Sequence, residues 1–270
     1  PAEPLCRSSK GDIFITTRRD VYLWHSSGSS VEKISPSEGI REITHSFMDP
    51  DDEFMISIRG NGLLVYDRNA HRMHRMPRET AERVLDRLDV SAMYMDKSGN
   101  RWVGCFLSQL MLFANDDDRS TVKYWHFSDY REAVSGTVTS LVSDDDGNLW
   151  IGYNNNGLTE MSPDGNMILK GDPTSYANSL FMDSHKRIWV GQYSGGLYLL
   201  NRKTGELENK VRNEITSVSA IAEDHQGRIY FAEPGDGFSQ LDPQDMKVSH
   251  YSSIARHSNG QWLSNEWIYS

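Results

Sequence analysis

Two short loops of this 270-residue chain combine tyrosines with side-chain amides, residue types that suit the recognition of sugars. Tyr153 is followed by Asn154 and Asn155, and Gln192 is followed by Tyr193. Tyrosine rings offer stacking faces and amides donate and accept hydrogen bonds, so together they match the apolar patches and hydroxyls of a sugar ring. We predict a ligand-binding role for these residues and expect Tyr153 and Tyr193 at the same position of adjacent repeats. The alternative is that both loops are tight turns with polar tips.

Three charged residues fall in equivalent loops and join the predicted ligand-binding set: Arg18, Arg59 and Glu233. An enzyme would need a general base there. Glu233 and Asp236 are carboxylates on this set of loops, and no histidine lies in them. We therefore predict no catalytic residues and favour binding over catalysis.

Metal-binding patterns are incomplete. Residues 144–148, Asp-Asp-Asp-Gly-Asn, look like the start of a calcium loop, but Asn155 stands at the twelfth position where such a loop needs Glu. His71 and His74 are three residues apart, without the spacing of a zinc motif. The sequence predicts no metal site and no cofactor, and the acidic run is expected to form a structural turn.

The elements that must position these loops recur six times. Around Gly147, an Asp lies three residues before, an aromatic three after, a small residue five after and an apolar residue eleven after. The same frame surrounds five other positions, at intervals of 39 to 48 residues, with Ser8 in place of the Asp in the first unit and Met55 in place of the aromatic residue in the second. The six anchors are Gly11, Asp52, Gly99, Gly147, Lys186 and Gly227, and the residues expected to be structural in the three best copies are Asp96, Trp102, Gly104, Asp144, Trp150, Gly152, Asp183, Trp189 and Gly191.

Each repeat predicts a small antiparallel sheet. β-branched and apolar residues 138–142 precede an Asp-x-x-Gly turn, and residues 149–152 form a second short strand. The Asp is expected to accept hydrogen bonds from turn amides and the Gly to supply a positive φ. A period of about 40 to 50 residues matches a four-stranded blade that must stack on its neighbours, with the Trp between blades and the small residue allowing close approach. We predict an all-β fold, a β-propeller of four-stranded antiparallel blades with six repeat units plus one strand.

The repeats set the predicted boundaries. Strands are expected at 43–48 and 54–58, a short helix at 78–88, and an outer strand at 124–127. Residues 265–270 look like the first strand of a further unit. One possibility is that this strand closes the ring with the N-terminus. The other is that the chain is a processed piece of a larger propeller, since it begins at Pro1 without an initiator Met or signal peptide. We favour the second. The six units are predicted at 5–42, 43–89, 90–136, 137–176, 177–216 and 217–264.

The composition of the chain disfavours several classes of function. A formal net charge of −10 disfavours a nucleic-acid surface, which needs a basic face, and makes a highly anionic ligand a poor fit. There is no run of apolar residues long enough to span a bilayer. The two cysteines, Cys6 and Cys105, are at non-equivalent positions and establish no disulfide.

The motif D-x-x-G-x-φ-W-φ-G followed by G-L, best seen at 144–158 and 183–197 and close at 96–104, resembles the two-component-regulator propeller repeat. The resemblance covers nearly the whole chain, although the units around Gly11 and Asp52 are weak matches. It implies the extracytoplasmic sensor region of a Bacteroides-type hybrid two-component system. On that basis we expect a periplasmic, non-catalytic module that recognises an oligosaccharide and regulates carbohydrate-utilisation genes. The resemblance also implies a homodimeric receptor, joined to the membrane and to a histidine kinase only through segments outside this chain. Alternatives are a propeller lyase or hydrolase acting on a glycan or small molecule, and a scaffold or dimerisation module.

Overall fold

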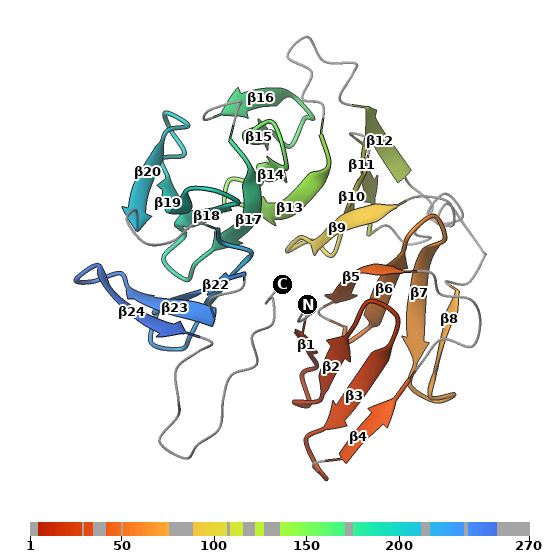
Figure 1. The fold of residues 1–270 in the computed structure, drawn as a ribbon. Helices are drawn as coiled ribbons and strands as arrows, with labels where there is room; N and C mark the ends of the chain where they lie inside the picture. Colours follow the sequence, from red (N-terminus) through yellow and green to blue (C-terminus); the bar gives the residue numbers. More distant parts are fainter. Residues whose placement is uncertain are drawn as a thin grey trace. The chain divides into compact units, whose positions relative to one another are not determined.

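The chain is all-β in a computed structural model, which describes residues 5–28, 30–34, 42–49, 51–75, 89–106, 109–115, 122–126, 136–170, 175–211, 217–234 and 237–252. Over these residues there is no helix, and the strands form six four-stranded sheets. Each sheet is antiparallel and its strands are hydrogen-bonded in chain order, so each is a simple up-and-down blade. The predicted four-stranded antiparallel blades are confirmed (Figure 1).

The blades fall into two compact units, residues 3–129 and residues 130–270, which we call the N-terminal and C-terminal units. The N-terminal unit holds blades 1 to 3: β1 (Leu5–Arg7), β2 (Ile13–Thr16), β3 (Val21–His25) and β4 (Ser30–Lys33); β5 (Ile43–Met48), β6 (Phe54–Ile58), β7 (Gly62–Asp67) and β8 (Arg72–Arg75); β9 (Val90–Met95), β10 (Arg101–Cys105), β11 (Gln109–Phe113) and β12 (Val122–His126).

The C-terminal unit holds blades 4 to 6, built in the same way (Figure 1). Their strands are β13 (Val138–Ser143), β14 (Leu149–Tyr153), β15 (Leu158–Met161) and β16 (Met167–Lys170); β17 (Ala177–Met182), β18 (Ile188–Gln192), β19 (Gly196–Leu200) and β20 (Leu207–Val211); β21 (Ala220–Glu223), β22 (Ile229–Glu233), β23 (Gly237–Asp242) and β24 (Lys247–Ser252).

Several predicted elements can be compared with this architecture. The strands expected at 43–48 and 54–58 are β5 and β6, with the same bounds. The predicted outer strand at 124–127 overlaps β12, which ends at His126. The predicted helix at 78–88 and the predicted terminal strand at 265–270 lie outside the described residues.

Within each unit the hydrophobic core lies between successive blades rather than within one sheet. Every residue of β6 is buried, because alternate side chains face opposite neighbours. Phe54 and Ile56 pack with Phe14 of blade 1, and Met55 packs with Val103 and other residues of blade 3. In the C-terminal unit Trp189 of blade 5 packs against apolar residues of blade 6. A blade thus buries both faces only when it has neighbours on both sides.

The Asp-x-x-Gly turn follows the sequence prediction. Asp144 Oδ1 accepts hydrogen bonds from the backbone amides of Asp146 and Asn148, both at 3.0 Å. All six anchor positions have positive φ, including the non-glycine residues Asp52 at 64° and Lys186 at 66°. The backbone at the anchor position therefore adopts the left-handed conformation, whether or not a glycine occupies it.

The small residues after the aromatic position mark close contacts between blades. A Cβ placed on Gly152 would lie 3.0 Å from the carbonyl oxygen of Ala177 in the next blade. A Cβ on Gly191 would lie 2.6 Å from a methyl group of Val218. The predicted close approach is confirmed at both glycines, since no side chain fits there without displacement.

Candidate functional site

The loops between second and third strands lie beside the loops that lead into the next blade. In the C-terminal unit, backbone amides of Asn154 and Gly157 donate to the carbonyl oxygens of Thr137 at 3.1 Å and Ser175 at 2.8 Å. The amide of Tyr193 donates to the carbonyl oxygen of Tyr176 at 3.3 Å. We call this hydrogen-bonded border, residues 136–137, 154–157, 175–176 and 193–195, the loop edge. Its two sets of loops meet at the same end of the blades, as predicted.

Two exposed tyrosines stand side by side on the loop edge. Tyr193 is 59% exposed and Tyr176 is 41% exposed, although both are large rings that folding usually buries at least in part. Their ring centroids are 6.2 Å apart and the planes are tilted by 44°. The pair presents an aromatic surface to solvent. The side chains of Asn154 and Asn155, on the loop edge in blade 4, are exposed as well.

Tyr176 is absent from the predicted set, because the sequence argument followed positions that recur between repeats. It lies in the loop that leads into β17, where no repeated residue type marks it. Tyr176 could have been found from the expectation that loops leading into the next blade lie at the same end of the blades as the loop of Tyr193.

The prediction that Tyr153 contacts a ligand is wrong. It is the last residue of β14, is fully buried, and pairs with Val138, whereas the equivalent residue in blade 5, which pairs with Ala177, is Gln192. Tyr193 lies one residue further along, so Tyr153 and Tyr193 are not at the same position. Burial raises the pKa of Tyr153, opposed in part by a hydrogen bond with Thr159. Tyr153 presents no stacking face to a ligand.

The amide residues divide between exposed and buried positions. Gln192 is 8% exposed and its loop is tight, since a Cβ on Gly195 would lie 2.7 Å from the Gln192 side-chain oxygen. The Asn154 side-chain oxygen accepts a hydrogen bond from the amide of Thr137 at 3.0 Å. Asn155 is exposed at the tip of the loop. Among the predicted ligand-binding residues of the C-terminal unit, those exposed on the loop edge are Asn154, Asn155 and Tyr193.

Glu233 is buried rather than presented on a loop. It is 5% exposed, and its Oε1 accepts a hydrogen bond from the Ser239 hydroxyl at 2.5 Å. His250 Nδ1 lies 3.2 Å from the same Oε1 and 2.8 Å from Ser239 Oγ. Sequence reasoning missed His250 because it belongs to the outer strand β24 and not to a loop. The carboxylate therefore holds an imidazole and a hydroxyl instead of facing solvent.

Arg18 and Arg59 of the N-terminal unit share one partner. Arg18 Nε lies 3.1 Å from Glu42 Oε1, and Arg59 Nε lies 2.8 Å from Glu42 Oε2. Backbone hydrogen bonds join the same residues, from Ile43 to the Arg18 carbonyl oxygen and from Arg59 to the Glu42 carbonyl oxygen. The two arginine side chains are 69% and 58% exposed, so they reach solvent while one carboxylate offsets part of their charge.

The aspartates of the Asp-x-x-Gly turns have a structural role. Asp144 is 4% exposed; burial on its own would raise the pKa of this carboxyl, but hydrogen bonds from Trp150, Asn148 and the turn amides hold its pKa below the usual value. Its Oδ2 accepts from Trp150 Nε1 at 2.9 Å. The same bond joins Asp96 to Trp102 at 3.0 Å and Asp183 to Trp189 at 2.8 Å. These carboxylates cap indoles, which explains the invariant spacing of six residues.

One group of possible metal ligands occurs among the described residues. Side-chain atoms of Asp183, His185 and Glu223 lie within 4.8 Å of one another. Asp183 already accepts hydrogen bonds from the Trp189 indole and the Arg187 guanidinium, and Glu223 accepts two from Ser184 at 2.7 and 2.8 Å. These donors occupy the carboxylate oxygens, so the cluster is a polar contact between blades 5 and 6.

Comparisons with known proteins identify the repeat. Residues 134–155 match the family model of the two component regulator propeller. The extracellular domain of the putative hybrid two component system BT4673 from B. thetaiotaomicron is similar with a TM-score of 0.77 and 19% identity, over 99% of this chain and 35% of that one. The corresponding domain of BT3049 from B. thetaiotaomicron has a TM-score of 0.55 and 18% identity, over 96% of this chain and 36% of that one.

A third similar structure is an enzyme. Virginiamycin B lyase from Staphylococcus aureus has a TM-score of 0.71 and 11% identity, over 93% of this chain and 84% of that one. A comparison with curated proteins finds no match. The chain spans little more than a third of the length of the sensor domains it resembles. No helix among the described residues is long and apolar enough to cross a membrane. The chain therefore has the predicted β-propeller fold and carries the two-component regulator propeller repeat at residues 134–155.

Proposed function

We propose that this chain is a ligand-sensing module of an extracytoplasmic two-component sensor, and that its C-terminal unit binds an oligosaccharide on the loop edge. The observation that carries the proposal is the exposed pair Tyr176 and Tyr193, with ring centroids 6.2 Å apart. Two exposed rings in contact form an apolar patch of the kind that marks ligand-binding surfaces. The matched repeat and the similar sensor domains support the sensor class.

The chemistry of the loop edge favours a neutral sugar. Tyr176 and Tyr193 supply stacking faces, and the amides of Asn154 and Asn155 supply hydrogen bonds to hydroxyls. The backbone hydrogen bond from the Gly157 amide to the Ser175 carbonyl oxygen joins the amide loop to the tyrosine loop. The chain's net charge of −10 opposes a polyanionic ligand.

Isothermal titration calorimetry tests the proposal with neutral gluco-, xylo-, manno- and galacto-oligosaccharides of two to six units. We expect saturable binding of at least one, weakened about ten-fold by Tyr193→Ala or Tyr176→Ala, which corresponds to roughly 1.4 kcal/mol. Tyr124→Ala is the matched control, because Tyr124 is 49% exposed but lies on the outer strand β12. Binding that is unaffected by both loop-edge substitutions would exclude this site.

The location and assembly of the intact receptor are part of the same proposal. We place the module in the periplasm, tethered through flanking segments, and propose that the receptor acts as a homodimer that regulates carbohydrate-utilisation genes. Light scattering of the longer receptor, with and without the bound oligosaccharide, measures the oligomeric state. A monomer under both conditions would contradict dimerisation while leaving sugar binding by this chain intact.

A second candidate function is a lyase reaction by acid–base catalysis. The observation that favours it is the carboxylate of Glu233 at 3.2 Å from His250 Nδ1, because a carboxylate at one imidazole nitrogen sets the tautomer in which the other nitrogen is a base. The fold similarity to virginiamycin B lyase supports the same class. Product formation from the same oligosaccharides, abolished by His250→Ala, would establish it. Binding without turnover would leave the sensor proposal in place and remove the lyase.

A further inference from the structure

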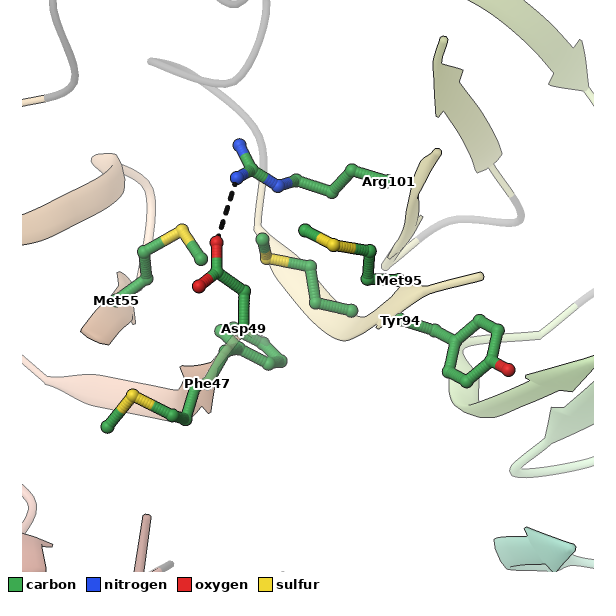
Figure 2. Close-up of a pocket in the computed structure, with 8 residues that line it drawn as sticks. Phe47, Asp49, Met55, Tyr94, Met95 and Arg101 are labelled. Carbon is green, nitrogen blue, oxygen red and sulfur yellow. Dashed lines mark hydrogen bonds and ion pairs between the residues drawn. The ribbon is translucent and has the colours of Figure 1, made fainter. Parts of the chain in front are cut away.

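A pocket of about 220 Å³ opens between blades 2 and 3 of the N-terminal unit (Figure 2). It lies at the ends of the strands that carry the Asp-x-x-Gly turns, and side chains from β5, β6, β9 and β10 surround it. Four of its lining residues are methionines, out of 11 in the whole chain. The lining residues are Phe47, Met48, Asp49, Met55, Met93, Tyr94, Met95 and Arg101.

The pocket exists because blade 2 departs from the repeat. Blades 3, 4 and 5 have Trp three residues after the turn anchor, but blade 2 has Met55 at this position. Phe47 pairs with Met55 in blade 2 as Phe181 pairs with Trp189 in blade 5. In blade 5 the indole is 1% exposed and packs against blade 6. An unbranched thioether side chain in the same frame is smaller than an indole, so a cavity remains beside it.

The hydrogen-bond acceptor of the missing indole is retained. In blades 3, 4 and 5 the second carboxylate oxygen of the turn Asp accepts a bond from the Trp of its own blade. In blade 2 the Asp49 Oδ2 accepts instead from Arg101 of blade 3, at 3.2 Å (Figure 2). Arg101 also lies 3.3 Å from Glu53 Oε2. The Arg101 guanidinium therefore takes the place of the indole donor at this end of the pocket.

The rest of the wall suits an aromatic ring. Thioether sulfurs are polarisable and make favourable contacts with ring edges, and unbranched methionines adapt to the shape of a guest. Met55 is 1% exposed, and Met93 and Phe47 pack against the same cluster, so the inner wall is apolar. An apolar protein cavity of roughly 150 Å³ takes up benzene, so a cavity of this size can hold a slightly larger ring system.

We propose that this pocket binds a small planar aromatic molecule of the indole class. The ring lies among the thioethers of Met55, Met93 and Met95, where the neighbouring repeats place their own indole. Its polar edge faces the ion pair of Asp49 and Arg101. The site belongs to the N-terminal unit and does not depend on sugar binding at the loop edge.

Methyl NMR of the whole chain tests the proposal directly. The chain is labelled with carbon-13 at the methionine methyl groups and titrated with indole. We expect saturable shifts of the Met55, Met93 and Met95 methyls and unchanged positions for the buried Met73 and Met161, which lie away from the pocket. The absence of saturable shifts up to the solubility of indole, or equal shifts at the control methyls, would overturn the proposal.

Two substitutions separate a filled pocket from a damaged one. Met55→Trp restores the indole of the repeat inside the protein, so we expect indole binding to be lost and the melting temperature to rise. Met55→Leu is the matched control, which changes the same residue but keeps the cavity, and should retain affinity within about three-fold. If Met55→Trp does not fold, Met95→Phe fills the pocket from the facing strand and should also abolish binding. Persistent indole binding in a folded pocket-filling variant would contradict the assignment.

A parallel titration with silver(I) tests the other chemistry that a thioether cluster supports, because soft metal ions prefer sulfur ligands. Saturable methyl shifts with silver(I) but none with indole would replace the proposed aromatic ligand by a soft cation. Saturation by indole alone is the result expected from the apolar wall and from the gap left by the missing indole.

Discussion

The indole nitrogen of Trp150 donates a 2.9 Å hydrogen bond to Asp144 Oδ2, six residues earlier in the chain. The ring is fully buried and the carboxylate is 4% exposed. The bond links the turn at the end of a blade to the side chain that fills the space between blades. It explains why Asp and Trp recur together at one spacing.

Removing this donor should destabilise the chain. In Trp150→Phe the smaller ring leaves a gap and the buried Asp144 carboxylate loses a partner, so we expect a loss of about 1 to 3 kcal/mol in the free energy of unfolding by urea. Trp24→Phe is the control, because Trp24 is only half-buried on β3 and is not a turn partner. A Trp150→Phe variant that loses no more stability than Trp24→Phe would contradict a stabilising role for the buried indole and its hydrogen bond.

The close approach at Gly191 predicts intolerance of a single methyl group. Gly191→Ala should lower the free energy of unfolding by about 1 to 3 kcal/mol, because Val218 of the next blade already fills the space of a Cβ. Gly28→Ala is the matched control, since a Cβ there would meet nothing closer than 3.8 Å. A Gly191→Ala variant as stable as Gly28→Ala would mean that blades 5 and 6 are not packed as described.

Lys186 occupies a left-handed turn position with φ of 66°, where the other repeats of the C-terminal unit have Gly147 and Gly227. Lys186→Gly should relieve roughly 1 kcal/mol of backbone strain. Part of this gain is offset because the exposed ion pair between Lys186 and Asp145 is lost. Lys186→Ala loses the same ion pair without the relief, so thermal unfolding should rank the glycine variant above the alanine variant. The reverse order would contradict the strain argument.

The stability of the N-terminal unit should depend on pH through His45. Burial lowers the pKa of His45 to about 4, opposed by a hydrogen bond with the Val90 backbone. The folded pKa is below the unfolded value of about 6.5, so the fold favours the neutral ring. The stabilisation is complete above pH 6.5 and is lost as the pH falls toward 4, by on the order of 2 kcal/mol.

Urea unfolding at pH 7 and pH 4.5 measures this dependence. His45→Gln should remove most of it. A His45→Gln variant with the same pH slope as the parent chain would assign the dependence to other groups.

The blades were predictable because their signal is local and repeated. The strands at Ile43–Met48 and Phe54–Ile58 follow from a frame of turn, aromatic and small residue that holds even where the individual types change. The structural roles of Asp144, Trp150 and Gly152 follow from the same recurrence. Their mutual bond does not, because six residues of separation in a sequence do not show which atoms meet.

The candidate site was predictable only in its location. A shift of one residue in a strand reverses the face of a side chain, which is why Tyr153 is buried and Tyr193 is exposed despite similar surroundings. Tyr176 and His250 lie at positions that do not recur, so no comparison between repeats finds them. The pocket beside Met55 arises from a missing indole, and its lining comes from two blades that are distant in sequence.

The most direct measurement of ligand recognition is fluorine NMR of the chain labelled with 3-fluorotyrosine, recorded during titration with the neutral oligosaccharide that binds most tightly by calorimetry. The resonances of Tyr176 and Tyr193, assigned by Tyr→Phe substitution, should shift together to saturation, while those of Tyr124 and the buried Tyr153 stay in place. A saturating oligosaccharide that leaves Tyr176 and Tyr193 unmoved would contradict binding at the loop edge.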